Sequence, residues 1–430
     1  MSNHLQVGVD FSQKNADYCL LFPDGRPLEP HIAFANSMSG YAQAKQLLLD
    51  ALETYSFDGI DLSGEATGYY WLPYFLQLAA DPDFAPHNLR LFLLNPRWVK
   101  WFEHCFPDDD KCDRKDPFYI ADRTRTRNPA TAWLPSDYLS LRFYTRLRFH
   151  LVHNLAREKC YFSAFLFLKA SSYRCLKPFS DVFGATSRLV LTEYPTPDDL
   201  AALPVQDLAA QLYELSGHHL PDPVSSARKL QQVARESFPL AENLALPVQR
   251  ILDITLAHIR FLEAQVEQVE AWIAAELAAY PAIAQLATIP GIGPVFSAGL
   301  GAEIGDIQRF LQGDKWDPQR KRLRKRNLRD AEDAVAKIAG LWWPRSASGD
   351  FEAEERHMAK SGNRYLRYYL IQAANLMYLH IPEYAAFYKR KYKEAAKHHH
   401  KRALVLTARK SVGLVVGLLH RNEPYRSKGA

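Results

Sequence analysis

Hydrophobic and polar residues alternate with two different periods in the first third of the chain. Residues 5–10 and 17–22 are short apolar runs that predict strands, and the turn sequence Pro-Asp-Gly-Arg follows the second run. Further strands are expected at residues 31–36, 59–64 and 89–94. Apolar residues recur at helical spacing between residues 39 and 52, and residues 70–79 also predict a helix. Three strands followed by alternating helix and strand indicate an α/β layer with a mixed sheet.

Residues 140–169 form a long helical pattern in which cations are interleaved with aromatic and aliphatic residues. Arg142 and Arg146 belong to this pattern. Two interpretations remain open from composition. The helix has a solvated basic face, or it presents a nucleic-acid surface in which cations meet phosphates and aromatic rings stack on bases.

Residues 248–273 carry a heptad repeat of apolar positions. One seam consists of Leu252, Ile259, Val266 and Ile273, and the alternate seam of Val248, Thr255, Leu262 and Val269. More than three heptads favour a coiled coil, and a long core helix is the alternative. A coiled coil between chains would explain dimerisation.

The last third contains glycine turns and basic blocks. Gly291 and Gly293 stand two apart between helical segments, as in a helix-hairpin-helix turn that binds phosphate or in a tight glycine-capped connection. The densest basic block is predicted to contact nucleic acid through Arg320, Lys321, Arg322, Arg324, Lys325 and Arg326. Residues 389–402 are also basic and include a histidine triplet, which predicts neither a tag nor a zinc site.

The composition limits the classes of protein to which this chain can belong. The chain has 430 residues, of which 47% are hydrophobic, enough for two or three domains with their own cores. A net charge of +5 permits a nucleic-acid partner without requiring one. The five cysteines are odd in number and their spacing fits neither a disulfide framework nor a zinc site. We expect reduced thiols in a cytoplasmic protein, without an apolar run long enough to cross a membrane.

Four acids are the candidate chemistry. Asp10 and Glu65 each end a predicted strand, while Asp113 and Asp116 lie three residues apart at the start of a predicted helix. Singly, each of them is also typical of a turn, a helix cap or an ordinary surface acid. Four carboxylates that meet would repel one another unless divalent cations lie between them. Hard oxygen ligands select Mg²⁺ or Mn²⁺, and two such ions at one site predict phosphoryl transfer.

The motifs that carry these acids resemble a known family, the DEDD transposases of the insertion-sequence 110 type, which are bridge-RNA-guided recombinases related to pilin-gene invertases. The N-terminal motifs are V-G-V-D at residues 7–10, G-E-A-T-G-Y-Y at 64–70, L-N-P at 94–96 and K-x-D-x-x-D at 111–116. The C-terminal motifs are I-P-G-I-G-P at 289–294, A-G-L at 339–341, S-G at 348–349 and K-S-G-N-R-Y-L-R at 360–367. They span most of the chain in the family's order.

The resemblance implies a fold and a chemistry. The N-terminal part would be an α/β RNase H-like (RuvC-like) domain whose Asp10, Glu65, Asp113 and Asp116 bind two Mg²⁺ or Mn²⁺ ions. The family's nucleophilic serine falls on Ser348, and Ser346 is its nearest competitor. The resemblance also favours nucleic-acid contact by Arg142 and Arg146. Arg364 and Arg367 would lie on a helix, where they clamp a phosphate or edge the core. Pro117 departs from the small residue that the family has after the last acid, and it predicts Asp116 as a helix N-cap.

These observations predict three domains: a catalytic domain at residues 1–130, a helical coiled-coil region with an insertion at 131–280, and a mostly helical C-terminal transposase domain at 281–430. The expected function is a DNA transposase that forms a covalent phosphoserine link. Its implied partners are donor and target DNA, a structured guide RNA and further copies of itself in a dimer or tetramer. The alternatives are a metal-dependent nuclease that uses water and a nucleic-acid-binding protein without catalysis.

Overall fold

The computed structural model describes residues 3–106, 114–127, 133, 135–193, 197–345, 347–348, 351–352 and 356–427. The chain falls into two compact units, Met1–Asp137 and Tyr138–Ala430. The first unit ends close to the boundary predicted at residue 130. The second unit holds everything that was predicted as two further domains.

The first unit is built on a mixed five-stranded sheet with the order β3-β2-β1-β4-β5. Its elements are β1 His4–Phe11, β2 Asn15–Leu21, β3 Pro27–Ala35, α1 Met38–Tyr55, β4 Gly59–Glu65, α2 Leu72–Ala80, η1 Pro82–His87, β5 Leu89–Leu94, α3 Pro96–Glu103 and α4 Asp116–Arg127. β1 pairs with β2 in antiparallel fashion and with β4 in parallel fashion. The five predicted strands are therefore confirmed, with β3 beginning earlier than expected.

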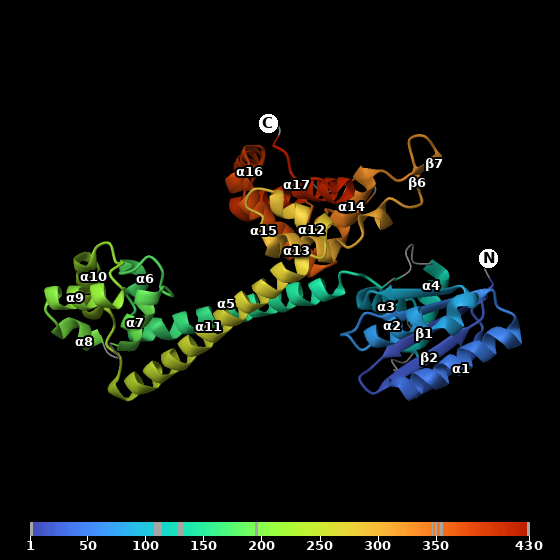
Figure 1. The fold of residues 1–430 in the computed structure, drawn as a ribbon, viewed down its shortest axis with the longest axis horizontal. Coiled ribbons are helices and arrows are strands. Elements are labelled where there is room, and N and C mark those ends of the chain that lie inside the picture. The colour runs from blue at the N-terminus through green and yellow to red at the C-terminus, as the bar shows by residue number, and fades with distance from the viewer. Residues whose placement is uncertain are drawn as a thin grey trace. The chain divides into compact units, whose positions relative to one another are not determined.

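Helices cover both faces of this sheet (Figure 1). The rings of Phe11 and Phe75 pack together, which places α2 on the face that also receives Val7 and Val9. Gly8 points to the opposite face, because side chains alternate along a strand, and there it touches the backbone of α4. The sheet is thus sandwiched between helical layers, a mixed α/β arrangement that is consistent with an RNase H-like domain.

The second unit is mostly helical. Its elements are α5 Leu139–Lys169, α6 Tyr173–Leu176, α7 Ala185–Glu193, α8 Pro197–Ala202, α9 Val205–Leu215, α10 Pro223–Glu236, α11 Glu242–Leu277, α12 Pro281–Ala284, η2 Gln285–Thr288, α13 Pro294–Ile304, η3 Ile307–Phe310, β6 Asp314–Asp317, β7 Arg322–Lys325, α14 Leu328–Ile338, β8 Ala347–Ser348, β9 Phe351–Glu352, α15 Arg364–His380, α16 Pro382–Glu394 and α17 His399–Arg421. The long helix predicted at residues 140–169 is confirmed as α5.

The helices α5 and α11 pack side by side in antiparallel directions (Figure 1). Ion pairs join Arg148 to Glu270 and Lys159 to Glu263, so residue numbers rise along one helix as they fall along the other. Leu252, Ile259 and Ile273 of the heptad are buried inside this unit. The heptad seam therefore packs within a single chain. The coiled coil predicted between chains is not shown, and the apolar residues of α11 that remain exposed include Ile254, Phe261 and Trp272.

The second unit has two hydrophobic cores. The smaller core gathers α6 to α10 around Phe162 and Leu166 of α5, and the larger core gathers α12 to α17 around Tyr369 and Met377 of α15. Helix α17 is long and apolar enough to cross a membrane by length and composition alone, which corrects the expectation that no run would qualify. More than half of its apolar window is buried within the protein, so it serves as a core helix. Cys19, Cys105, Cys160 and Cys175 are free thiols, as predicted.

Candidate functional site

Asp10 and Glu65 lie at the same edge of the sheet. β1 and β4 run parallel, with Gly8 opposite Ser63 and Val9 opposite Gly64, so this register brings Asp10 beside Glu65. Adjacent strands are about 4.8 Å apart, a separation at which two carboxylates can share a cation. The register thus juxtaposes two of the predicted acids, although 55 residues separate them in sequence.

Both acids belong to the face of the sheet that carries α4. The Ser63 hydroxyl donates to the Thr124 hydroxyl of α4 at 2.5 Å, and Glu65 follows two positions later on the same face. Gly8 is on this face too, because a Cβ built there would lie 2.0 Å from the Pro117 carbonyl oxygen. Asp10 follows Gly8 by two positions and therefore shares the face.

The third acid begins the helix that packs on this face. The Lys115 carbonyl accepts the Tyr119 N–H at 3.1 Å, so Lys115 occupies the cap position and Asp116 is the first helical residue. The expectation that Asp116 itself is the cap is therefore wrong by one residue. Pro117 stands at the second helical position, where its missing N–H costs no helical hydrogen bond. Asp116 is half-buried, in the first turn of a helix that packs against β1.

The fourth acid, Asp113, lies outside the described residues. Within the part of the chain that the structure describes, no three His, Cys, Asp or Glu side chains are grouped closely enough to hold a metal. The donor set nevertheless suits magnesium, because Asp10, Glu65 and Asp116 offer only carboxylate oxygens. Glu65 accepts a hydrogen bond from the Thr67 hydroxyl at 2.6 Å, which orients one of its oxygens.

A further acid was missed by the sequence analysis. Asp17 of β2 lies directly opposite Asp10 in the antiparallel register, and its carboxylate is 3.0 Å from Nε2 of His31 on β3. The row Glu65, Asp10, Asp17 and His31 therefore crosses four adjacent strands. The apolar run at residues 17–22 predicted the strand, but the sequence did not reveal which strand would pair with β1.

The loop that carries Ser348, here called the serine loop, runs from residue 343 to residue 358. A backbone hydrogen bond joins the residues on either side of it. The Ala359 N–H donates to the Trp342 carbonyl at 3.0 Å, and these residues hold the two stems of the loop together. Between them Ala347 pairs with Glu352 and Ser348 with Phe351, so Ser348 ends one strand of a very short hairpin. Ser346 lies outside the described residues, and the assignment of the nucleophile to Ser348 stays a prediction.

Several cations predicted to bind nucleic acid have partners within the protein. Arg146 donates to both carboxylate oxygens of Glu303, at 2.7 and 3.0 Å, and Arg142 donates to the Ala302 carbonyl. Arg367 donates to the backbone carbonyls of Ala339 and Lys360. These three guanidinium groups tie helices and loops together, and their contact with nucleic acid stays a prediction. Arg364 is exposed and lies over the rings of Phe149 and Tyr365.

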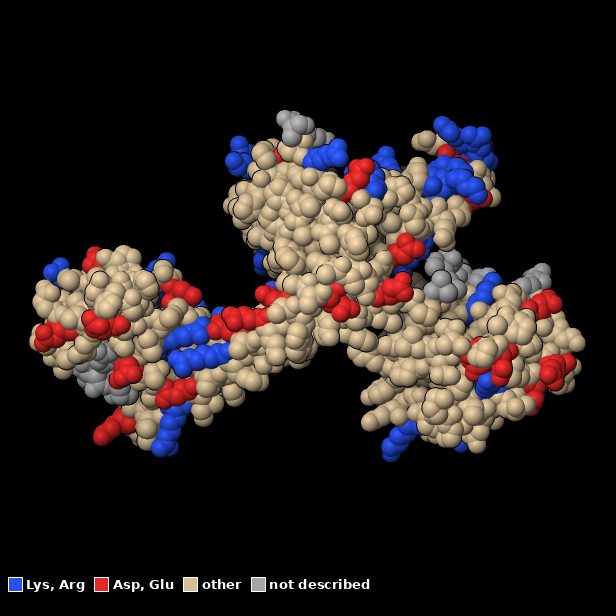
Figure 2. All heavy atoms as spheres, in the orientation of Figure 1, with Lys and Arg blue, Asp and Glu red and all other residues tan. Residues whose placement is uncertain are grey.

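The basic block forms the β6–β7 hairpin, over which Lys and Arg side chains gather on the surface (Figure 2). Arg320 and Lys321 lie in the turn, and Arg322, Arg324 and Lys325 lie on β7, with Arg326 following it. Arg324 is bound to Asp330 at 2.5 Å and Lys325 to Asp314 at 3.1 Å. Trp316 and Leu323 are cross-strand neighbours on this hairpin and both are largely exposed.

The predicted helix-hairpin-helix turn lies between η2 and α13. Gly291 has a φ of +85°, a left-handed conformation that favours glycine, and a Cβ there would lie 2.6 Å from the His380 ring. Gly293 caps α13, and no atom lies within 4 Å of the place where its Cβ would be. Gly291 is thus required for the turn, while the phosphate contact predicted at Gly293 stays open.

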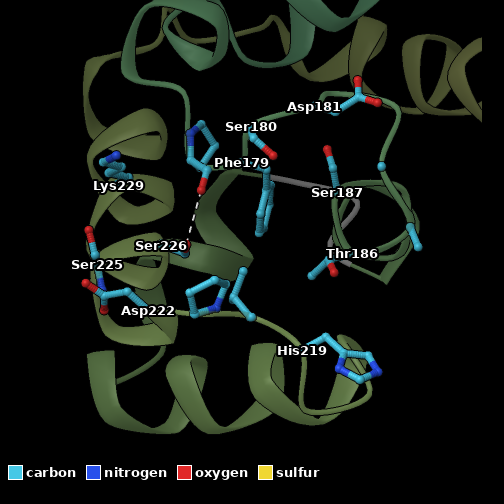
Figure 3. A pocket seen from close by; sticks show the side chains of 15 residues that line it. Phe179, Ser180, Asp181, Thr186, Ser187, His219, Asp222, Ser225, Ser226 and Lys229 are labelled. Carbon is cyan, nitrogen blue, oxygen red and sulfur yellow. Dashed lines mark hydrogen bonds between the residues drawn. The ribbon is translucent and has the colours of Figure 1, made fainter. Parts of the chain in front are cut away.

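One cavity, of about 450 Å³, lies between the loop after α6 and the starts of α7 and α10 (Figure 3). Several of its polar groups form local hydrogen bonds. Ser226 donates to the Pro178 carbonyl, and the carboxylates of Asp181 and Asp222 accept backbone N–H groups of nearby turns. Hydrogen bonds of this kind hold loops in place, and we assign this cavity no chemistry.

A second cavity, of about 780 Å³, lies beside the stems of the serine loop. It combines Trp343, Arg356 and Lys360 from those stems with Lys397, which precedes α17, and with Lys401 and Arg402 from the first turn of α17. Residues 389–402 are basic in the sequence, but their spacing predicted no role for them. Their charge was visible in the sequence, whereas their meeting with the serine loop depends on tertiary packing.

The mixed sheet, with Asp10 and Glu65 at one of its edges, forms an α/β domain that is consistent with the RNase H-like class of DEDD enzymes. Two family models match the chain: that of the DEDD transposases of the IS110 type at residues 7–168, and that described as the transposase IS116/IS110/IS902 family at residues 323–389. The chain belongs to the IS110-type DEDD transposases. No curated protein matches the sequence.

Proposed function

We propose that this transposase cuts and rejoins DNA through a covalent phosphoserine intermediate, with two divalent cations held by Asp10, Glu65, Asp113 and Asp116. One observation carries the metal part of the proposal. The parallel register of β1 and β4 brings Asp10 beside Glu65 on the face where α4 begins with Asp116. Two carboxylates on adjacent strands repel one another unless cations or protons offset the repulsion.

The four acids would hold Mg²⁺ or Mn²⁺. When bound, the two ions supply positive charge for the oxygens of the reacting phosphodiester. The protein's own contribution is to fix the positions of the ligands. Asp10 and Glu65 lie on adjacent strands, and Asp116 lies in the first turn of a helix whose backbone contacts Gly8, so the ligands are attached to the sheet and to the helix packed on it.

Ser348 would be the nucleophile. Its Oγ forms a bond to phosphorus while the bond from phosphorus to one bridging oxygen of the DNA breaks, and the serine proton passes, in net terms, to the leaving oxygen. The DNA strand then remains attached as a phosphoserine ester, and no phosphodiester energy is lost. Attack by a DNA hydroxyl on this ester reverses the step, rejoins the strand and returns the proton to Ser348.

Partners follow from the family resemblance. We infer that the protein binds donor and target DNA together with a structured guide RNA, and that it acts as a dimer or tetramer in the cytoplasm. The exposed cations of the β6–β7 hairpin, Arg320, Lys321 and Arg322, support a polyanionic partner because they project where phosphates can approach them.

Trapping the intermediate tests the proposal. Wild-type protein is incubated with Mg²⁺, DNA that flanks the gene and RNA transcribed from that flank, and is then denatured. We expect a protein–DNA adduct that Ser348→Ala abolishes, while binding of both nucleic acids stays nearly normal because only one hydroxyl is lost. Ser346→Ala is the matched control in the same loop.

The alternatives give different results in this assay. If Ser346→Ala is inactive and Ser348→Ala is active, the nucleophile is assigned to the wrong serine. Cleavage by both variants without any adduct favours a nuclease that uses water at the same acids. Binding without metal-dependent cleavage by wild-type protein contradicts both enzymatic functions.

A further inference from the structure

The β6–β7 hairpin is a two-stranded ribbon, with no third strand beside it among the residues that the structure describes. It projects from the helices of the second unit (Figure 1). Residues 314–326 contain seven Lys or Arg and two Asp, so their net charge is +5. An isolated two-stranded hairpin is at best marginally stable in water, and this one also carries repelling charges. Its conformation therefore depends on contacts with the rest of the unit.

One face of the hairpin is fixed to the start of α14. Lys315 and Arg324 are cross-strand neighbours, and both donate to the carboxylate of Asp330, at 2.7 and 2.5 Å. Asp330 is buried and forms the capping box of α14 with Asn327, so the anchor belongs to the helix itself. This face of the hairpin is thus covered by the protein.

The opposite face carries an apolar pair. Because side chains alternate along a strand, Trp316 and Leu323 point away from α14. The two residues are directly opposite each other in the register, so their side chains are neighbours. They are 55% and 63% exposed. Covering such a pair with an apolar part of a partner is favourable, since it removes apolar surface from water.

Cations lie beside this apolar pair. Arg320, Lys321 and Arg322, here called the turn cations, are exposed and form no ion pair with any residue in the described part of the chain. The acids of the hairpin, Asp314 and Asp317, are each paired with a cation of the neighbouring strand. The hairpin therefore fits a polyanion that offers an apolar surface between its charges.

The major groove of duplex DNA combines these features. It is about 12 Å wide and admits a two-stranded ribbon, and it displays the methyl groups of thymine between two phosphate backbones. The minor groove is only about 6 Å wide and shows no methyl group, while the major groove of an RNA duplex is too narrow for side chains to enter. Single strands are bound by aromatic rings that stack on successive bases, whereas this face has one ring beside an aliphatic side chain.

We propose that the outward face of the β6–β7 hairpin lies in the major groove of duplex DNA, with Trp316 and Leu323 against thymine methyl groups. The turn cations then contact phosphates at the edge of the groove. This inference rests on the proposed function, in which DNA is a partner. It adds the element that enters the duplex and a preference for thymine at the bases that this element touches.

Replacing thymine by uracil in the DNA tests the contact, because it removes only the methyl group. The full-length protein is titrated, in EDTA, with a duplex of alternating A·T pairs and with the same duplex containing deoxyuridine in place of thymidine. Wild-type protein should bind the uracil duplex roughly 4-fold more weakly for each methyl group in contact. In Trp316→Ala/Leu323→Ala, here called the apolar-pair variant, the two duplexes should bind equally.

Three further variants serve as controls. Phe238→Ala removes a ring that is 75% exposed outside the hairpin, and it should keep the wild-type ratio between the two duplexes. Trp316→Leu retains an apolar side chain and should keep most of the uracil effect. Neutralising the turn cations with glutamine should weaken both duplexes by the same factor, because their phosphates are identical. The apolar-pair variant should unfold in denaturant like the wild type, since both of its altered side chains are exposed.

Several outcomes overturn the proposal. An equal uracil effect in the apolar-pair variant is one, and the lack of any uracil effect in the wild type is another. A loss of affinity in the apolar-pair variant that is confined to single-stranded DNA would mark stacking on an unpaired base. A loss confined to RNA would mark an RNA site.

The assay also separates this proposal from the proposed function. Ser348→Ala should bind both duplexes like the wild type, because no chemistry takes place in EDTA. A uracil effect that depends on the apolar pair supports the groove contact even where no phosphoserine adduct can be trapped. A trapped adduct without any uracil effect overturns the groove contact and leaves the proposed function in place.

Discussion

Gly8 of β1 lies directly against the backbone of Pro117 in α4, so closely that a Cβ on Gly8 would lie 2.0 Å from the Pro117 carbonyl oxygen. This contact sets how near the first turn of α4, with Asp116, comes to the strand that carries Asp10. Only a residue without a side chain allows it, because the obstacle is backbone and cannot rotate away.

Gly8→Ala should therefore push α4 from the sheet. We expect a loss of roughly 1–3 kcal/mol in the free energy of unfolding, with a partial loss of metal-dependent cleavage as Asp116 moves from Asp10. Denaturant unfolding and a cleavage assay measure the two effects. Gly413→Ala in α17 is the control, since the atoms nearest to its Cβ would belong to the flexible side chain of Glu332. A Gly8→Ala protein of wild-type stability would contradict the packing described here.

Asp10→Ala and Glu65→Ala should each abolish DNA cleavage while the protein remains folded. Removal of one acid from a group of like charges relieves repulsion, so stability without metal should hold or rise. Asp116→Ala should have the mildest effect, since Pro117 departs from the family pattern. Glu53→Ala, which removes an exposed acid of α1, is the control. Substantial Mg²⁺-dependent cleavage by Asp10→Ala or Glu65→Ala would exclude the assigned metal site.

Neutralising the turn of the β6–β7 hairpin should weaken nucleic-acid binding without regard to sequence. In the triple variant Arg320→Gln/Lys321→Gln/Arg322→Gln, the slope of log affinity against log salt should fall by roughly 0.9 for each lost contact to duplex phosphate. Titrations at several salt concentrations measure it. An unchanged slope would mean that these cations form only a solvated surface.

Asp330 should give part of the protein's stability a pH dependence. The Arg324 guanidinium, with Lys315, holds the pKa of the Asp330 carboxyl well below its usual range. Because this pKa is lower in the folded protein than in the unfolded chain, ionisation of Asp330 stabilises the fold at pH values above the unfolded pKa of about 3.9. This stabilisation is lost as the pH falls below that value toward the pKa of the folded state. Asp330→Asn should lower the free energy of unfolding by roughly 1–3 kcal/mol at pH 7. The difference from the wild type should shrink at pH 3, and a constant difference would contradict this assignment.

Arg146→Ala should destabilise the second unit. The Glu303 side chain is only 1% exposed and is held by Arg146 and by Asn363, so removal of the guanidinium leaves a buried charge short of a partner. We expect a loss of roughly 3–5 kcal/mol, as measured for broken buried ion pairs. Adding Glu303→Gln should recover part of it, because the remaining group is then neutral. A variant that unfolds like the wild type but binds DNA more weakly would instead support the nucleic-acid role.

Much of the local structure was determined by the sequence alone. The alternation and the helical periods predicted the strands of the first unit and the helix α5, because these periods reflect which side chains face a core. The heptad of α11 correctly marked a buried seam, since apolar residues every seven positions must be covered by something. The motifs around Asp10, Glu65 and Ser348 were sufficient to indicate the family.

Only the tertiary structure decided which groups meet. The partner of the α11 seam proved to be α5 of the same chain, and Arg146 found Glu303 across 157 positions of sequence. Asp17 came to lie opposite Asp10 through strand register, and one cavity of about 780 Å³ came to be lined by both Trp343 and Lys401. A side chain's spacing along the chain determines the face on which it lies. The charge or ring that it meets there depends on long-range packing, which local periodicity does not encode.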